Sequence, residues 1–169
     1  MRDIPDPGFA DDDGSAPAEL VDALLAYDAD PDARHDATLA VLQDARLLVP
    51  VVALLGDVEY DENGLASDKT SDMATVLVQG RDGRTALLAF TSTGALLRWN
   101  PEARPVPVTV ARAAEAALQD GAGALVVDVA GPVMFVVEAA DLAELAQGGV
   151  LVRLGEGVSD RYGWATPDR

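Results

Sequence analysis

The sequence predicts an α+β fold, a single domain with a mainly antiparallel, hairpin-rich sheet and helices packed on its faces. Some segments carry apolar residues at helical spacing. Others are short valine- and leucine-rich runs that flank glycine turns in pairs. These two kinds of segment are mixed along the chain, which is typical of α+β domains. With 169 residues, the chain is long enough for one substantial core and too short for two ordinary domains.

The chain divides into three parts. Residues 1–15 are rich in Asp, Pro and Gly, and we expect them to form a disordered acidic tail. Residues 16–154 are expected to form the α+β domain. Residues 155–169 are expected to form a flexible C-terminal tail, in which Tyr162 and Trp164 could dock on the domain.

Two helices are expected to open the domain. Ser15 and Pro17 mark the start of the first helix, which carries an apolar stripe at helical spacing. Asp30 and Pro31 supply a cap and a first-turn proline for the second helix, which continues to Ala45.

A strand and a hairpin are expected next. The apolar run LLVPVVALL at residues 47–55 predicts a strand covered on both faces, and Pro50 within it favours an edge position or a bulge. The segments MATVLVQ (73–79) and RTALLAF (84–90) predict a hairpin, because Asp82–Gly83 between them readily adopts a tight turn.

The pattern after residue 90 alternates between helical and extended segments. TSTGALLRW, residues 91–99, predicts a short helix capped by Thr91 or Ser92. Residues 104–110 are expected to be extended because their prolines disfavour helix. Residues 111–121 form an alanine-rich helical pattern that ends at a glycine.

A second hairpin and a last helix complete the predicted domain. ALVVDVAGPVMFVVE, residues 124–138, predicts two strands that turn at residues 130–132. AADLAELAQ, residues 139–147, predicts the helix that follows.

Composition excludes several classes of protein. The net charge is −17, from 29 acidic and 12 basic residues, so we expect no direct binding to nucleic acid or to an anionic membrane. The absence of cysteine excludes a disulfide framework and a thiol nucleophile. No apolar run approaches the roughly 20 residues that span a bilayer. The N-terminal residues also lack the order of a signal peptide, so a cytoplasmic location is expected.

The acidity is concentrated in the first part of the chain. Residues 1–72 hold 18 acids and 4 bases, a net charge of −14, whereas residues 73–169 hold 11 acids and 8 bases, a net charge of −3. Solubility is the favoured interpretation, attraction to a basic protein partner is the sharper one, and a saline habitat is a third. The oligomeric state is not predicted.

Acidic and glycine-rich motifs do not favour a metal or a cofactor. GDVEYDENG, residues 56–64, has part of a calcium-loop spacing but places Thr70 where a bidentate Glu is required. GAGALV, residues 121–126, lacks the third glycine of a dinucleotide fingerprint and leads from helix into strand. His35 adjoins Asp36 on a predicted helix, where neighbours point in different directions, and is expected to be exposed. No catalytic, cofactor-binding or metal-binding residue is predicted.

The candidate interaction or ligand loop comprises Asp68, Lys69, Ser71 and Asp72. Lys69 is the only lysine and could act as a nucleophile only if it were desolvated or close to another cation. Asp68 and Asp72 favour its charged form instead, so a loop lysine paired with carboxylates is the favoured interpretation. Ser71 and Asp72 are expected to cap the turn into the next strand.

The stretch DKTSDMATVLVQGRDGRTALLAFTSTGALLRWNPEARPVPV, residues 68–108, resembles the SseB N-terminal-domain family, the "enhanced serine sensitivity" proteins, in its actinobacterial-type form. The resemblance depends on the entry at 69–74, the Gly80–Gly83 turn, LLAFTS at 87–92, Trp99 and ARPVPV. GAGALVVDVAGPVMFVVE, residues 121–138, is similar to the family's second half, so the likeness covers about residues 36–147.

The resemblance implies a cytoplasmic bacterial α+β protein of unassigned molecular activity, and it carries over no catalytic residue. The expected function is a non-enzymatic binding or regulatory module that acts through protein–protein contacts. The alternative is a role in sensing or converting a small molecule, in serine or other amino-acid metabolism, with the site in the loop at residues 57–72.

Overall fold

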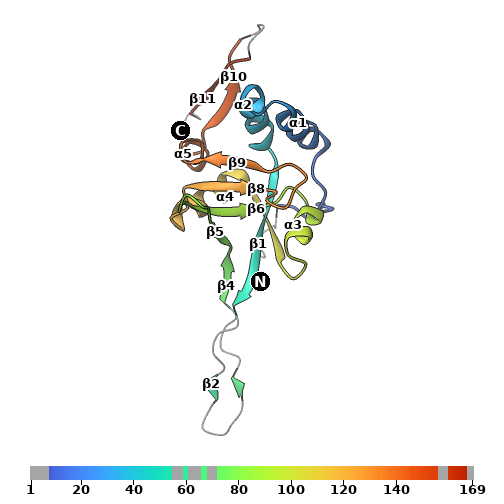
Figure 1. Cartoon of the computed structure of the whole chain (residues 1–169), viewed down its shortest axis with the longest axis vertical. Coiled ribbons are helices and arrows are strands. Elements are labelled where there is room, and N and C mark those ends of the chain that lie inside the picture. Colours follow the sequence, from blue (N-terminus) through green and yellow to red (C-terminus); the bar gives the residue numbers. More distant parts are fainter. Residues whose placement is uncertain (1–7, 55–58, 61–65, 68–71, 156–159, 167–169) are drawn as a thin grey trace, which may run out of the picture.

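The computed structural model describes residues 8–54, 59–60, 66–67, 72–155 and 160–166. It has the α+β architecture that the sequence predicts, in one domain (Figure 1). In chain order, the elements are α1 (Ala18–Ala29), α2 (Pro31–Leu42), β1 (Arg46–Leu54), β2 (Glu59–Tyr60), β3 (Ala66–Ser67), β4 (Asp72–Thr75), β5 (Leu77–Gln79), β6 (Thr85–Ala89), α3 (Thr93–Trp99), β7 (Arg104–Thr109), α4 (Val110–Gln119), β8 (Ala124–Val127), β9 (Phe135–Glu138), α5 (Ala139–Ala146), β10 (Val150–Arg153) and β11 (Tyr162–Ala165). None of the helices in these ranges is long and apolar enough to cross a bilayer.

β1 is the middle strand of a three-stranded antiparallel sheet in the order β4-β1-β7, so the predicted edge position of Pro50 is wrong. Leu48 exchanges two backbone hydrogen bonds of 2.8 Å with Phe90, and the ladder with β4 begins at Val51. Backbone groups alternate in direction along a strand, so the missing N–H of Pro50 lies where β1 passes from one neighbour to the next. Pro105, opposite Pro50 in β7, lacks an N–H as well.

The second sheet has the strand order β5-β6-β8-β9. Both predicted hairpins are confirmed, because β5 pairs with β6 and β8 pairs with β9 in antiparallel fashion. β6 and β8 are parallel, so α3, β7 and α4 form the crossover between them. The predicted strand at 73–79 is divided at Val76, since β4 pairs with β1 and β5 pairs with β6.

Side chains of the central strands alternate between two apolar cores. In β6 and just after it, Leu87 and Ala89 enter the core formed with α1, α2, α4 and α5. Leu88 and Phe90 enter a smaller core on the other side, where α3 packs. Because both faces are covered, residues 86–91 are all buried, and the run reads as continuously apolar.

The predicted start signals are confirmed except at the first helix, and α2 ends at Leu42, three residues before the predicted Ala45. Asp30 caps α2 by accepting a hydrogen bond from the Ala33 N–H (3.3 Å), and Gly121 ends α4 with a φ of 75°. At α1, however, the N-cap is Pro17, which makes no side-chain capping bond. The Ser15 hydroxyl donates to the Asp13 carboxylate instead.

Two segments that composition assigned to tails lie against the domain. Within residues 8–15, Asp12 forms an ion pair with Arg46 of β1, which differs from the disorder expected there. Near the C-terminus, β11 pairs with β10 where a flexible tail was expected. Tyr162 and Trp164 supply the physical reason, because both side chains pack against the larger core.

Candidate functional site

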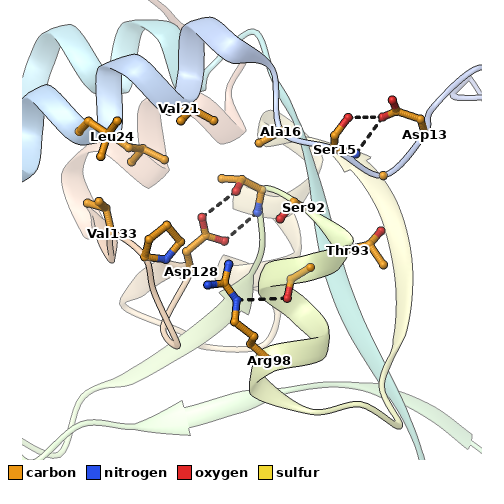
Figure 2. Close-up of a pocket in the computed structure, with 15 residues that line it drawn as sticks. Asp13, Ser15, Ala16, Val21, Leu24, Ser92, Thr93, Arg98, Asp128 and Val133 are labelled. Atoms are coloured by element: carbon orange, nitrogen blue, oxygen red, sulfur yellow. Dashed lines mark hydrogen bonds between the residues drawn. The ribbon is translucent and has the colours of Figure 1, made fainter.

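A pocket of about 530 Å³ opens between α1, the segment that precedes α1, the start of α3 and the turn between β8 and β9 (Figure 2). One side of it is apolar and is formed by Val21, Leu24, Leu25, Pro132 and Val133. The other side is polar and is formed by Asp13, Ser15, Thr91, Ser92, Thr93, Arg98 and Asp128. Pockets of this size hold small organic molecules in many proteins.

Asp128 is the buried carboxylate of the pocket, with only 1% of its surface exposed. Its Oδ1 accepts a hydrogen bond from the Thr91 N–H (2.9 Å), and its Oδ2 accepts one from the Thr91 hydroxyl (2.7 Å). The backbone φ of Asp128 is 54°, in the left-handed region that few residues other than Gly, Asn and Asp adopt. The Thr91 bonds therefore hold a charged group that is both buried and conformationally strained.

Burial raises the pKa of the Asp128 carboxyl above its ordinary value. The two hydrogen bonds from Thr91 and the positive charge of Arg98 act in the opposite direction and offset part of this effect. A carboxylate has about four acceptor positions, and Thr91 fills two of them. Asp128 can therefore still accept hydrogen bonds from a molecule in the pocket.

Arg98 brings a positive charge to the exposed side of the same pocket. Figure 2 shows its side chain pointing from α3 toward the turn that carries Asp128. Its Nε donates to the carbonyl oxygen of Gly94 at 3.4 Å, which is a long bond. Arg98 and Asp128, both of which the structure describes, form no direct ion pair. Each of the two charged groups can therefore bind a ligand in the pocket.

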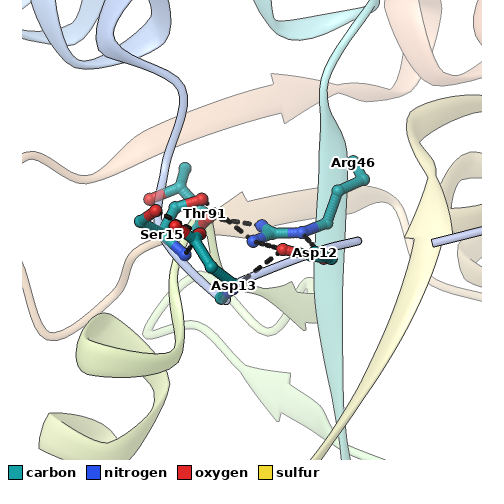
Figure 3. Close-up of polar contacts among 6 residues, drawn as sticks. Asp12, Asp13, Ser15, Arg46 and Thr91 are labelled. Atoms are coloured by element: carbon teal, nitrogen blue, oxygen red, sulfur yellow. Dashed lines mark hydrogen bonds and ion pairs between the residues drawn. The ribbon is translucent and has the colours of Figure 1, made fainter. Parts of the chain in front are cut away.

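The segment at residues 12–16, which we call the strap, contributes residues 13–16 to the lining of the pocket, and Figure 3 shows the polar contacts that join it to Arg46. Arg46 fastens it. The guanidinium binds the Asp12 carboxylate through Nε and Nη2, the latter at 2.7 Å. It also donates to the carbonyl oxygens of Ser15 (3.0 Å) and Thr91 (2.6 Å). This hydrogen bonding with Arg46 lowers the pKa of Asp12. One side chain thus joins the strap to the residue that holds Asp128.

Gly14 makes the closest backbone contact between the strap and α3. Its carbonyl oxygen accepts a hydrogen bond from the Thr93 N–H at 2.8 Å, and its φ is 81°. A Cβ at this position would overlap the Thr93 hydroxyl. Glycine is therefore required by both the backbone conformation and the close approach.

The pocket brings hydroxyl groups and carboxylates together in pairs. A catalytic site usually joins a nucleophile, a base and an orienting group. Among the residues that line this pocket, two hydroxyls are bonded to a carboxylate, that of Thr91 to Asp128 and that of Ser15 to Asp13. In the described chain, the side-chain bonds of each carboxylate come only from the residue that supplies the hydroxyl, so neither pair has a third, orienting group. A bound molecule would meet the carboxylate, the guanidinium and the apolar wall.

The candidate loop at residues 68–72 stays a prediction. Asp68, Lys69 and Ser71 lie outside the described residues. Asp72 is the first residue of β4, and only its backbone is described. The acidic segment 56–64 likewise falls mostly outside the described ranges.

His35 differs from the exposed residue that was expected. Its side chain is 29% exposed, and its ring stacks on Phe135 with the ring centres 5.1 Å apart. Its Nδ1 also lies 3.2 Å from an Asp36 carboxylate oxygen. The stacking explains the partial burial, because Phe135 extends the larger core to the surface of α2.

The residues of the pocket were not among those predicted from the sequence as a candidate site. Thr91 or Ser92 was expected to cap α3, and Ser92 does so by accepting from the Ala95 N–H (3.1 Å). Thr91 turns instead to Asp128, which was read only as part of a hairpin. The usable signal was a single acid inside the apolar run ALVVDVAGPV, because a charge at such a position needs a buried partner.

Comparison with known proteins yields one match. The family model of the SseB protein N-terminal domain matches residues 20–144, more than half of the chain. The matched region contains Thr91, Arg98 and Asp128, and the strap precedes it. No curated protein and no solved structure matches the chain.

Proposed function

The chain belongs to the SseB protein N-terminal domain family, and we propose that it acts there as a non-enzymatic binding module whose Asp128 pocket holds a small molecule. The site differs from the loop at 57–72 that the sequence favoured for a small-molecule role. We further propose that the module works in the cytoplasm, because an acidic composition without cysteine is compatible with that compartment.

The observation that carries the proposal is the buried carboxylate of Asp128 beside an open pocket. Burying a charge is unfavourable unless hydrogen bonds and opposite charges compensate it. Strained backbone and perturbed carboxyl groups are concentrated at functional sites. Here both features occur in one residue, next to a cavity of suitable volume. The bonds with Thr91 fill only two of the acceptor positions of the carboxylate, so Asp128 can bind a ligand in addition to holding the turn.

A thermal-shift screen tests the proposal. Small cations, anions, zwitterions and neutral polyols are added one at a time to the wild-type chain and to the Asp128→Asn variant. A ligand of the pocket should raise the melting temperature of the wild type, since saturation at 100 times Kd stabilises a fold by about 2.7 kcal/mol. The shift should be smaller in Asp128→Asn.

Asp22→Asn is the matched control. It removes the same charge from an exposed position of α1 that does not line the pocket, so it should respond as the wild type does. The proposal is wrong if no class of compound stabilises the wild type, or if every shift is the same in Asp128→Asn.

The protein–protein role expected from the acidic composition stays a prediction. The described surface offers no feature that selects one partner over another, because acidity alone favours basic proteins in general. A small-molecule site and a protein contact are compatible, since an occupied pocket could regulate a neighbouring surface.

A further inference from the structure

Building on the proposed function, we propose that the ligand of the Asp128 pocket is a small zwitterion. Its ammonium group binds Asp128, its acidic group binds Arg98, and a short apolar body lies against α1.

The buried end of the pocket favours a cationic donor. Asp128 keeps two acceptor positions after its bonds with Thr91. An ammonium group supplies several N–H donors and an opposite charge, and such charge-assisted bonds are about twice as strong as neutral ones. A ligand that carries only a negative charge would be repelled by this carboxylate, with no opposite charge on the ligand to compensate the repulsion.

The exposed side of the pocket favours an anion. The Arg98 guanidinium has five N–H donors, and among the described residues only its Nε is hydrogen-bonded, to the Gly94 carbonyl oxygen. Its remaining donors match the geometry of a carboxylate, which a guanidinium binds through two parallel hydrogen bonds. A simple amine would leave this charge without a partner from the ligand.

The apolar wall of the pocket favours a hydrocarbon group for the rest of the ligand. Val21, Leu24 and Leu25 of α1 face the pocket, with Val133 across from Leu24 (Figure 2). Leu25 is 55% exposed and Val21 40% exposed, so a hydrocarbon body placed here would remove apolar surface from water. A chain of a few carbons fits a cavity of about 530 Å³ whose polar groups are at its other side.

Three matched probes dissect the proposal by isothermal titration calorimetry. L-norvaline carries both charged groups, butylamine lacks the carboxylate, and pentanoate lacks the ammonium group. Each missing charge-assisted contact should weaken binding about tenfold or more, so L-norvaline should bind most tightly.

Variants assign each contact. Asp128→Asn should abolish the preference for L-norvaline over pentanoate, and Arg98→Gln should abolish the preference over butylamine. Arg112→Gln, at an exposed position of α4 outside the pocket, should change neither preference.

The outcomes separate this inference from the proposed function. If butylamine binds as tightly as L-norvaline and Asp128→Asn weakens it, or if pentanoate does and Arg98→Gln weakens it, the pocket is a binding site and the zwitterion is refuted. If none of the three probes binds while another class stabilises the chain in the screen, the zwitterion is again refuted alone. If no compound of any class binds, both proposals are wrong.

Discussion

Replacing Asp128 by alanine should destabilise the fold by about 3 to 5 kcal/mol. The Thr91 N–H and hydroxyl would both lose their acceptor, and Thr91 is 4% exposed, so water reaches them poorly. Each orphaned group costs about 1–3 kcal/mol. Alanine at a φ of 54° adds about 1 kcal/mol, and removal of a buried charge offsets part of the sum.

Asp128→Asn is the matched variant that separates hydrogen bonding from charge. Its side-chain oxygen can accept from the Thr91 N–H, its amide can donate to the Thr91 hydroxyl, and Asn tolerates the left-handed region. The free energy of unfolding at neutral pH should therefore stay within about 1 kcal/mol of the wild type or exceed it. Urea denaturation followed by circular dichroism measures both variants.

The pH dependence follows from the raised pKa of Asp128. The folded state holds the proton up to a higher pH than the unfolded state, whose Asp pKa is about 3.9. Stability from this group is therefore fully present below the unfolded pKa and is lost as pH rises through the raised folded pKa. Relative to Asp128→Asn, the wild type should gain stability on acidification.

Two results would refute this reasoning about Asp128. An alanine variant within 1 kcal/mol of the wild type would mean that the Thr91 bonds contribute little in solution. An alanine and an asparagine variant that lose the same stability would mean that the charge, and not the hydrogen bonding, holds the turn in place.

Two further substitutions test the strap and the C-terminal hairpin. Gly14→Ala should lower the free energy of unfolding by about 1–3 kcal/mol and expose the Thr93 amide to hydrogen exchange, because its Cβ would overlap the Thr93 hydroxyl. Gly83→Ala is the control, since Gly83 has the same φ of 81° and no atom within 4 Å of an added Cβ, and it should lose less stability. Equal losses of stability would contradict the docking of the strap on α3. The Gln43 side chain bonds both the N–H (2.8 Å) and the carbonyl oxygen (2.9 Å) of Leu151. Gln43→Ala should therefore lower the free energy of unfolding in urea by about 1–3 kcal/mol and speed hydrogen exchange of the Leu151 amide. Unchanged exchange would mean that Gln43 does not hold the C-terminal hairpin.

Local chemistry made much of the fold predictable. The Gly80–Gly83 turn and the Asp30–Pro31 helix start depend on neighbouring residues, and both predictions are confirmed. The position of Pro50 depends on which strands lie beside β1, and periodicity within the run carries no such information. The prediction failed there because the neighbour of β1 changes from Phe90 to β4.

The candidate site was much less predictable for a related reason. Thr91 and Asp128 are 37 residues apart, and Arg46 and Asp12 are 34 residues apart. The first contact arises only when the parallel pairing of β6 with β8 brings the ends of both strands together, and the second only when the strap lies against β1. The strap was also hidden by its composition, because one guanidinium orders a segment that looks too polar to fold.

Titration of the ¹⁵N-labelled chain with L-norvaline, followed through amide chemical shifts, tests whether the Asp128 pocket binds the ligand. The largest shifts should occur at Gly14, Thr91, Thr93 and Asp128, which surround the pocket. Asp128→Asn should remove these shifts. Shifts that are absent, or that gather away from the pocket, for example on β10 and β11, would contradict binding in the Asp128 pocket.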